Sequence, residues 1–196
     1  MVQLKQLVDM CNDFFILTEK DTKGAMNVLL NCADSNTLDI FHNIVNISTP
    51  IKATKFGGNR CYDLINASNG LFLVHNRIID VFEKNSIRGW GTIPVIIQGK
   101  SSTYCYDYSL LTINSKLVQL NKDCSIPFNQ NTNNIPINAR SIKIGFSIDI
   151  STWDGSDIFS ANNTFYVIIT NKVRELLIKN KVTNCDIINI NDVEVF

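Results

Sequence analysis

The chain has 196 residues, of which 45% are hydrophobic and 18% charged, and its 18 basic and 18 acidic residues cancel. This composition is typical of a folded soluble protein and excludes a disordered one, and the neutral charge gives no sign of a nucleic-acid or anionic membrane partner. Its apolar runs are far shorter than the roughly 20 residues of a membrane span, and charges interrupt its N-terminus where a signal peptide is continuous. We therefore expect a cytoplasmic protein.

The cysteine pattern excludes the common zinc-ribbon and thioredoxin-type sites. No CxxC pair occurs among the six cysteines, and their spacings are wide and irregular. Without an export signal, reduced structural thiols are favoured over a disulfide framework. We expect no cofactor and no metal. The cysteines are Cys11, Cys32, Cys61, Cys105, Cys124 and Cys185.

The N-terminal section, residues 1–55, mixes helical and strand patterns. Apolar residues at helical spacing predict a helix over residues 2–11, and "FFIL" at 14–17 predicts a buried strand. Residues 21–33 predict a second, weaker helix, because a glycine interrupts the pattern. Residues 33–50 are loop-like with room for another short helix. This section is expected to be less regular than the rest.

The middle of the chain predicts strands and loops. Aromatic and β-branched residues predict a strand over 102–113, with residues 116–121 pairing beside it. The polar, Asn- and Pro-rich stretch at 125–139 predicts a long loop. "SIKIGFSIDI" at 141–150 alternates apolar and other residues without interruption, which predicts one continuous half-buried strand.

Two segments, residues 59–97 and 151–190, share a pattern. When Asn76 is placed over Asn171, strand, helix and strand positions from Leu71 to Val95 align without a gap, and the match continues upstream after a one-residue slip. Both asparagines stand at predicted helix starts, where a side-chain oxygen can accept free backbone N–H groups. The pattern predicts two similar β-α-β units within one α+β domain of 1–196, built around a mixed sheet. Whether the units arose by duplication stays open.

The end of the chain resembles a known family. "DISTWDGSDIF", followed by "YVIITNKVRELLIKNKVTNCDIINI", is similar to the closing part of bacterial immunity family eleven, formerly a domain of unknown function. The turn at 157–159 and the strand, helix and strand at 168–184 carry the resemblance, which is good over 145–190, fair over 59–97 and absent before residue 55. The resemblance implies a protein that neutralises a cognate polymorphic toxin by direct binding. It carries over no catalytic residue.

Three carboxylates surround the "WDGSD" turn, and three interpretations apply to them. Asp149, Asp154 and Asp157 could bind a divalent cation, although a calcium loop needs a denser run of oxygen ligands. Turn chemistry is favoured instead, because Asp154 and Gly155 form a turn pair and Asp157 can accept local backbone N–H groups. The third interpretation is a partner contact at this acidic, tryptophan-bearing turn.

Partner-binding residues are predicted at the two tryptophans and the acidic turn. Trp90 lies between two glycines, and Trp153 precedes Asp154; tryptophan is enriched at interface hot spots. The Trp90 indole could instead fold back onto the core. We predict Trp90, Trp153 and Asp154 as contact residues.

Two rival functions stay open. A small hydrolase or transferase could use Cys, His and Asp groups, although His42 and His75 show no metal-ligand spacing or nucleophile signature. A structural or regulatory module could form homo-oligomers through an exposed sheet edge. We prefer a non-enzymatic protein whose partner is the toxin.

Overall fold

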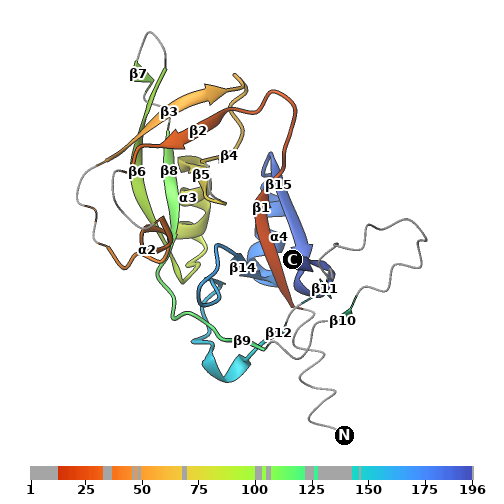
Figure 1. Cartoon of the computed structure of the whole chain (residues 1–196). Helices are drawn as coiled ribbons and strands as arrows, with labels where there is room; N and C mark the ends of the chain where they lie inside the picture. Colours follow the sequence, from red (N-terminus) through yellow and green to blue (C-terminus); the bar gives the residue numbers. More distant parts are fainter. Residues whose placement is uncertain are drawn as a thin grey trace, which may run out of the picture.

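The computed structural model describes residues 13–32, 37–45, 47, 50–67, 70–99, 103–104, 107–121, 126–127, 143–145 and 147–195. The fold is α+β, mostly sheet with few helices, and its largest part is a closed six-strand barrel. Figure 1 shows the barrel on one side and a smaller sheet beside it.

The barrel closes because its first and last strands pair. Around it the order is β3 (Ile51–Gly57), β2 (Asn27–Leu30), β4 (Leu64–Asn66), β5 (Phe72–His75), β8 (Tyr108–Ile113) and β6 (Trp90–Gln98). The pairs β2–β4 and β3–β6 are parallel and the others antiparallel, so the sheet is mixed as expected. β7 (Thr103–Tyr104) extends β6. Closure leaves few free strand edges.

The second sheet is antiparallel throughout. Its order is β13 (Ile158–Phe159), β14 (Val167–Thr170), β1 (Phe14–Glu19) and β15 (Cys185–Asn189). Two minor ladders lie outside it. They are β9 (Leu120–Asn121) with β12 (Ser147–Ile148), and β10 (Ile126–Pro127), β11 (Lys143–Ile144) and β16 (Glu194–Val195).

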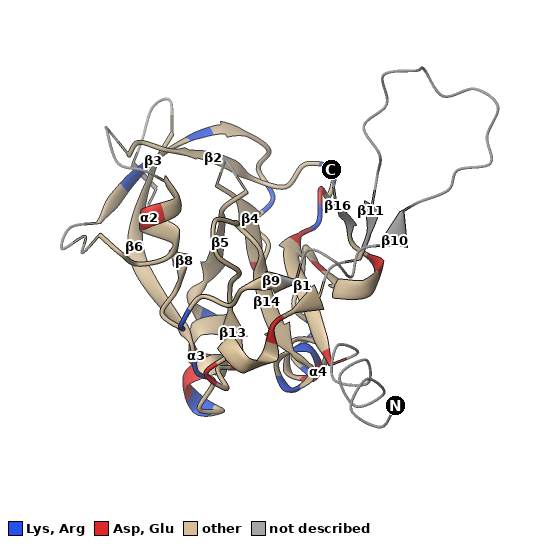
Figure 2. Cartoon of the chain, turned by 60° about the horizontal axis from the view of Figure 1, so that its bottom comes forward, with Lys and Arg blue, Asp and Glu red and all other residues tan. Residues whose placement is uncertain are grey.

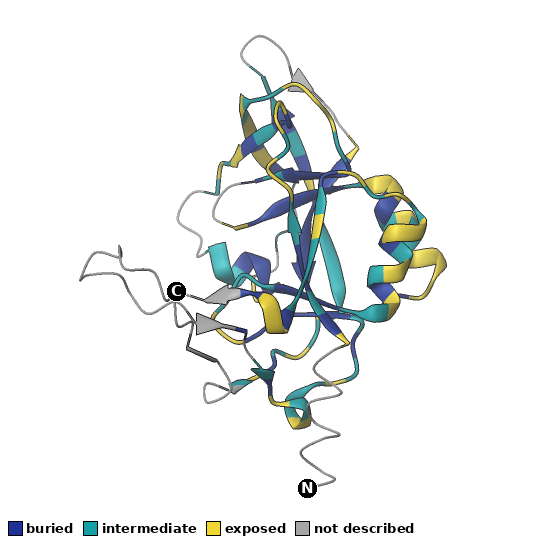
Figure 3. Ribbon diagram, turned by 90° about the vertical axis from the view of Figure 1, so that its right-hand side faces the viewer, coloured by how far each residue is buried: buried dark blue, intermediate teal, exposed yellow. Residues whose placement is uncertain are grey.

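The helices are short and amphipathic. α2 is Thr37–Phe41, α3 is Asn76–Lys84 and α4 is Asn171–Lys179, with 3-10 turns η2 (Ile150–Thr152) and η3 (Ile190–Asp192). α3 buries Ile78 and Phe82, while α4 buries Val173 and Leu177. Each therefore packs one apolar stripe inward and leaves its outer face exposed (Figure 3). No helix in the described part of the chain is long and apolar enough to cross a membrane.

Two apolar clusters hold the fold together. The larger contains the barrel interior and the buried residues of α3 and α4. The smaller lies on the other face of the second sheet, around Phe14, Phe159 and Ile168, where Trp153 packs against it. The clusters meet across the second sheet, because neighbouring strand residues point to opposite faces.

Several expectations are confirmed. The strand predicted at 14–17 is β1, and a short helix, α2, lies within residues 33–50. α3 and α4 form where the aligned patterns predict helices. The helix predicted at 2–11 lies outside the described residues. So does the loop predicted at 125–139, except for residues 126–127, which form β10.

The helix predicted over residues 21–33 is wrong. Gly24 takes a φ of 82° and turns the chain, and β2 follows. In β2, Val28 is buried and Leu29 exposed, which is the alternation of a strand. Pairing in the barrel overrides the helical propensity of the leucines.

The continuous strand predicted over 141–150 is also wrong. Gly145, with a φ of 76°, separates β11 from β12, and the two short strands join different ladders. The expected pairing of residues 116–121 beside 102–113 does not occur either, since β9 pairs with β12. A simple alternation does not reveal a positive-φ glycine that redirects the chain.

Candidate interaction surface

The "WDGSD" turn is built by its own hydrogen bonds. The Asp154 carboxylate accepts from the backbone N–H of Ser156 and of Lys116, both at 2.9 Å, and Gly155 has a φ of 81°. Burial alone would raise the pKa of Asp154, but these hydrogen bonds hold it below its usual value. The turn chemistry predicted for Asp154 and Gly155 is confirmed.

The neighbouring carboxylates have separate partners. Asp157 accepts from the backbone N–H of Arg88 at 2.9 Å and forms a 3.2 Å ion pair with Lys172. Asp149 caps η2 by accepting from the Ser151 N–H at 3.0 Å. Nowhere in the described ranges do three His, Cys, Asp or Glu side chains gather closely enough to hold a metal ion.

Both predicted tryptophan anchors are half-buried and bonded internally. The Trp90 indole donates to the Ile87 carbonyl at 2.8 Å and contacts the Phe82 ring edge-on. The Trp153 indole donates to the Ser156 carbonyl at 3.0 Å and contacts Phe14 and Phe159. Each ring packs on an apolar cluster, so any role as a partner contact stays a prediction.

The structure brings two of the predicted segments together. A Cβ on Gly89 would lie 2.6 Å from the Ser156 Cβ, so the turn that holds Trp90 touches the turn that holds Asp154. Trp153 faces the smaller apolar cluster instead. These residues therefore do not form one common exposed patch.

The two histidines make local contacts within the fold. His75 caps α3 by accepting from the Arg77 N–H, and His42 lies 3.1 Å from the Thr164 carbonyl oxygen. Burial lowers the pKa of His42. The cap at α3 is thus His75 rather than the predicted Asn76, which is the first helical residue. Cys32, Cys61 and Cys185 are free thiols.

An exposed apolar face lies on the outside of the barrel, where β2 pairs with β3. Phe56 is 66% exposed and Leu29 is 50% exposed. Lys52 and Thr54 are exposed on the same side of β3, and Thr54 lies directly opposite Leu29. We call Leu29, Lys52, Thr54 and Phe56 the β2–β3 face. These two large apolar side chains, exposed on neighbouring strands, make the face a candidate for part of an interaction site.

A polar cavity borders this face. It has a volume of about 400 Å³, and its lining includes Phe56, Glu19, Asn66 and Asn184. Asn184 is buried, donates from its amide to the Leu64 carbonyl at 2.8 Å, and leaves its Oδ1 without a hydrogen-bond partner among the described residues.

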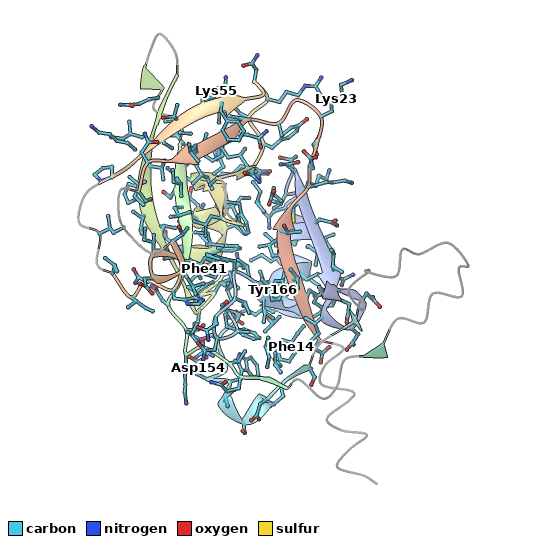
Figure 4. The ribbon with its side chains drawn as sticks, viewed as in Figure 1. Phe14, Lys23, Phe41, Lys55, Asp154 and Tyr166 are labelled. Atoms are coloured by element: carbon cyan, nitrogen blue, oxygen red, sulfur yellow. The ribbon has the colours of Figure 1, made fainter. Side chains whose placement is uncertain are left out.

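Basic residues lie in and next to β2 and β3 in the sequence. Besides Lys52, they are Lys20, Lys23, Lys55 and Arg60, against the acidic Glu19 and Asp21. Figure 2 shows Lys and Arg at this end of the barrel, and Figure 4 places Lys23 and Lys55 there with Asp154 at the opposite end of the view.

Sequence reasoning missed Phe56, although a signal was present. In "IKATKFG" Ile51 and Ala53 point into the barrel, so the alternation of a strand puts Phe56 outside. Leu29 was missed because its segment was interpreted as helical. Neither a model of a known protein family nor a curated protein sequence matches this chain.

Proposed function

We propose that this protein neutralises a bacterial toxin by binding it directly, as an immunity protein does, and that the β2–β3 face makes the contact. The sequence resemblance at residues 145–190 suggests the class of partner. The exposure of Phe56 beside Leu29 is the observation that carries the proposal. The protein acts by covering the toxin, not by chemistry of its own.

The expected partner surface is acidic around an apolar pocket. The Phe56 ring would enter that pocket, since buried aromatic anchors supply most of the energy of such interfaces. Lys52 would face carboxylates at the rim, where charges steer encounter more than they add affinity. Stable contact needs about 1,600 Å² of buried surface in total, so the partner extends well beyond these side chains.

The test uses the full chain and the polypeptide encoded next to its gene. Binding is measured by calorimetry with the purified pair, and protection is measured as growth when both are co-expressed. Phe56→Ala is expected to weaken binding by about 100-fold, as truncation of a hot-spot residue does. Thermal unfolding of this variant should match that of the parent, because the side chain is exposed.

Ile178→Ala is the matched control. Ile178 is 56% exposed on α4, so the same kind of truncation is made elsewhere on the surface. It should leave binding unchanged. Equal binding by Phe56→Ala and the parent would refute the assignment of this face, and absence of binding and protection by the parent would refute the function. Self-association of the parent through this face, seen by light scattering, would support the rival oligomeric module instead.

We also infer that segments 59–97 and 151–190 are two equivalent units that serve as the scaffold for this face. Each contains a short strand, a nine-residue helix and a returning strand. In each, the two strands are separated by one antiparallel strand, so they are parallel without being neighbours. Closely packed units of this kind suit rigid presentation of a binding surface.

A further inference from the structure

Two stretches of the chain have identical element bounds at a fixed spacing. β5 and α3 cover Phe72–His75 and Asn76–Lys84, and β14 and α4 cover Val167–Thr170 and Asn171–Lys179. All four bounds of the first pair become those of the second when 95 is added. Two unrelated strand–helix units would not be expected to begin and end at matching positions at all four boundaries.

The helix ends repeat at the same spacing. Asn85 and Asn180 each donate from the side-chain amide to the carbonyl four residues earlier, both at 2.8 Å. The next residues, Ser86 and Lys181, have left-handed φ angles of 51° and 50°. Left-handed backbone at a residue other than glycine is uncommon, so its recurrence at matched positions is informative.

Contacts between the two units are reciprocal. Asp63 accepts from the Thr183 N–H at 2.7 Å, and Asp157 accepts from the Arg88 N–H at 2.9 Å. Arg88 and Thr183 are 95 residues apart, and the aspartates are 94 apart. The next residues behave alike: the Leu64 N–H donates to the Thr183 carbonyl, and the Ile158 N–H donates to the Arg88 carbonyl. Such exchange of equivalent contacts is the signature of a two-fold, isologous interface.

The central strands of the two sheets are alike as well. "DFFILTE" at 13–19 and "DYSLLTI" at 107–113 share Asp, Leu and Thr at a spacing of 94 residues. β1 lies between β14 and β15, and β8 lies between β5 and β6, antiparallel in every case.

These two strands also occupy their sheets in the same register. Phe14 lies opposite Thr170, and Tyr108 lies opposite His75, which is 95 residues before Thr170. The carbonyl of Asp13, just before β1, accepts the N–H of Asn171 at the start of α4. The carbonyl of Asp107, just before β8, likewise accepts the N–H of Asn76 at the start of α3.

The positions of β1 and β8 along the chain do not match the sheets in which they lie. β1 begins the N-terminal half, residues 13–98, but lies in the sheet of the C-terminal half, residues 107–189. β8 begins the C-terminal half and lies in the barrel of the N-terminal half. Each half thus contributes its first strand to the other.

We propose that the chain is a fused two-fold pair of halves in which the first strands, β1 and β8, are exchanged. Exchange of an identical element between partners is a known route to dimers, and here both partners belong to one chain. Neither half can open without withdrawing a central strand from the other, so the two sheets unfold together. This inference does not depend on the proposed function.

The test interchanges the two strands up to their shared threonine in the full chain, so that "YSLL" replaces residues 14–17 and "FFIL" replaces residues 108–111, while Glu19 and the buried Ile113 keep their places. If the two positions are equivalent, the variant folds cooperatively, with a thermal midpoint within about 10 °C of the parent. The control reverses residues 14–19 to "ETLIFF", which keeps the composition and places a glutamate at the buried Phe14 position. The control should lose cooperative unfolding.

If the interchanged chain does not fold, a circular permutant tests whether β1 and β8 are exchanged between the two halves. Joining residue 196 to residue 1 and opening the chain between residues 99 and 107 gives the C-terminal unit the strand order that the N-terminal unit already has. A permutant with the near-ultraviolet spectrum and monomeric mass of the parent supports exchange. Failure of both the interchanged chain and the permutant to fold would overturn it.

Discussion

Two contacts join the units 59–97 and 151–190: Asp63 bonds the turn at Thr183, and Asp157 bonds the turn at Arg88. We call them the Asp63 and Asp157 junctions, and they differ in the number of hydrogen bonds that each carboxylate receives. At Asp63 the carboxylate receives a bidentate pair of bonds from Arg77 and two more from the N–H and hydroxyl of Thr183. At Asp157 it receives one backbone N–H and one lysine. The side chain of Asp63 is 7% exposed and that of Asp157 13%. The two junctions share a backbone arrangement, but we expect them to contribute unequally to the free energy of unfolding.

The junctions also differ where the turn approaches the next strand. At the Asp157 junction Gly89 lies directly against the Ile158 carbonyl, whereas at the Asp63 junction Asn184 donates its amide to the Leu64 carbonyl. The Asp157 junction depends on the close approach of two backbone segments, and the Asp63 junction depends on a side-chain hydrogen bond. The strength of each therefore depends on different atoms.

Replacement of Gly89 is expected to have the largest effect. Gly89→Ala adds a Cβ that would lie 2.0 Å from the Ile158 carbonyl oxygen, at a φ of 94°. Both the overlap and the strain disfavour it, and we expect a loss of about 4 kcal/mol of unfolding free energy. Chemical denaturation measures it. Gly70→Ala, which has a similar φ of 79° but no contact under 3.4 Å, is the matched control and should lose about 1–2 kcal/mol.

Loss of the two carboxylates should separate the junctions directly. Asp63→Ala removes the acceptor of the Thr183 N–H and the bidentate partner of Arg77, which is 43% exposed and can be hydrated, so we expect a loss of about 2 kcal/mol. Asp157→Ala should lose about 1 kcal/mol, because its lysine partner is half-exposed and can be hydrated. Denaturant midpoints of the two variants give the comparison. Equal losses would show that burial and bond number do not distinguish the junctions.

Acid should weaken the Asp63 junction in a defined window. Burial alone would raise the pKa of Asp63, but the bonds from Arg77 and Thr183 outweigh it and leave the pKa below its usual value. A lowered folded-state pKa gives stability that is complete above the unfolded value of about 3.9 and is lost as the pH falls through the folded value. Asp63→Asn should therefore show a shallower loss of stability below pH 4. An unchanged slope in denaturant titrations would contradict this assignment.

The sequence predicts the local units better than their assembly. Helices α3 and α4 follow from apolar spacing, and β1 follows from an uninterrupted apolar run, because these signals depend on neighbouring residues. The insertion of β1 between β14 and β15 depends on contacts 150 or more residues away, for which a single sequence offers no direct signal. The alternation that exposes Phe56 was readable, but only once β3 was recognised as a barrel strand.

The exposed ion pair at the weaker junction should contribute least. Lys172 is 53% exposed and reaches Asp157 at 3.2 Å, so water and salt screen the attraction. Lys172→Met keeps the aliphatic part of the side chain and removes the charge, and we expect a change below about 0.5 kcal/mol. Because the Arg88 N–H still bonds Asp157, the junction keeps its backbone contact. A loss as large as that of Asp157→Ala would mean that the ion pair, and not the bond to the turn, holds this junction together.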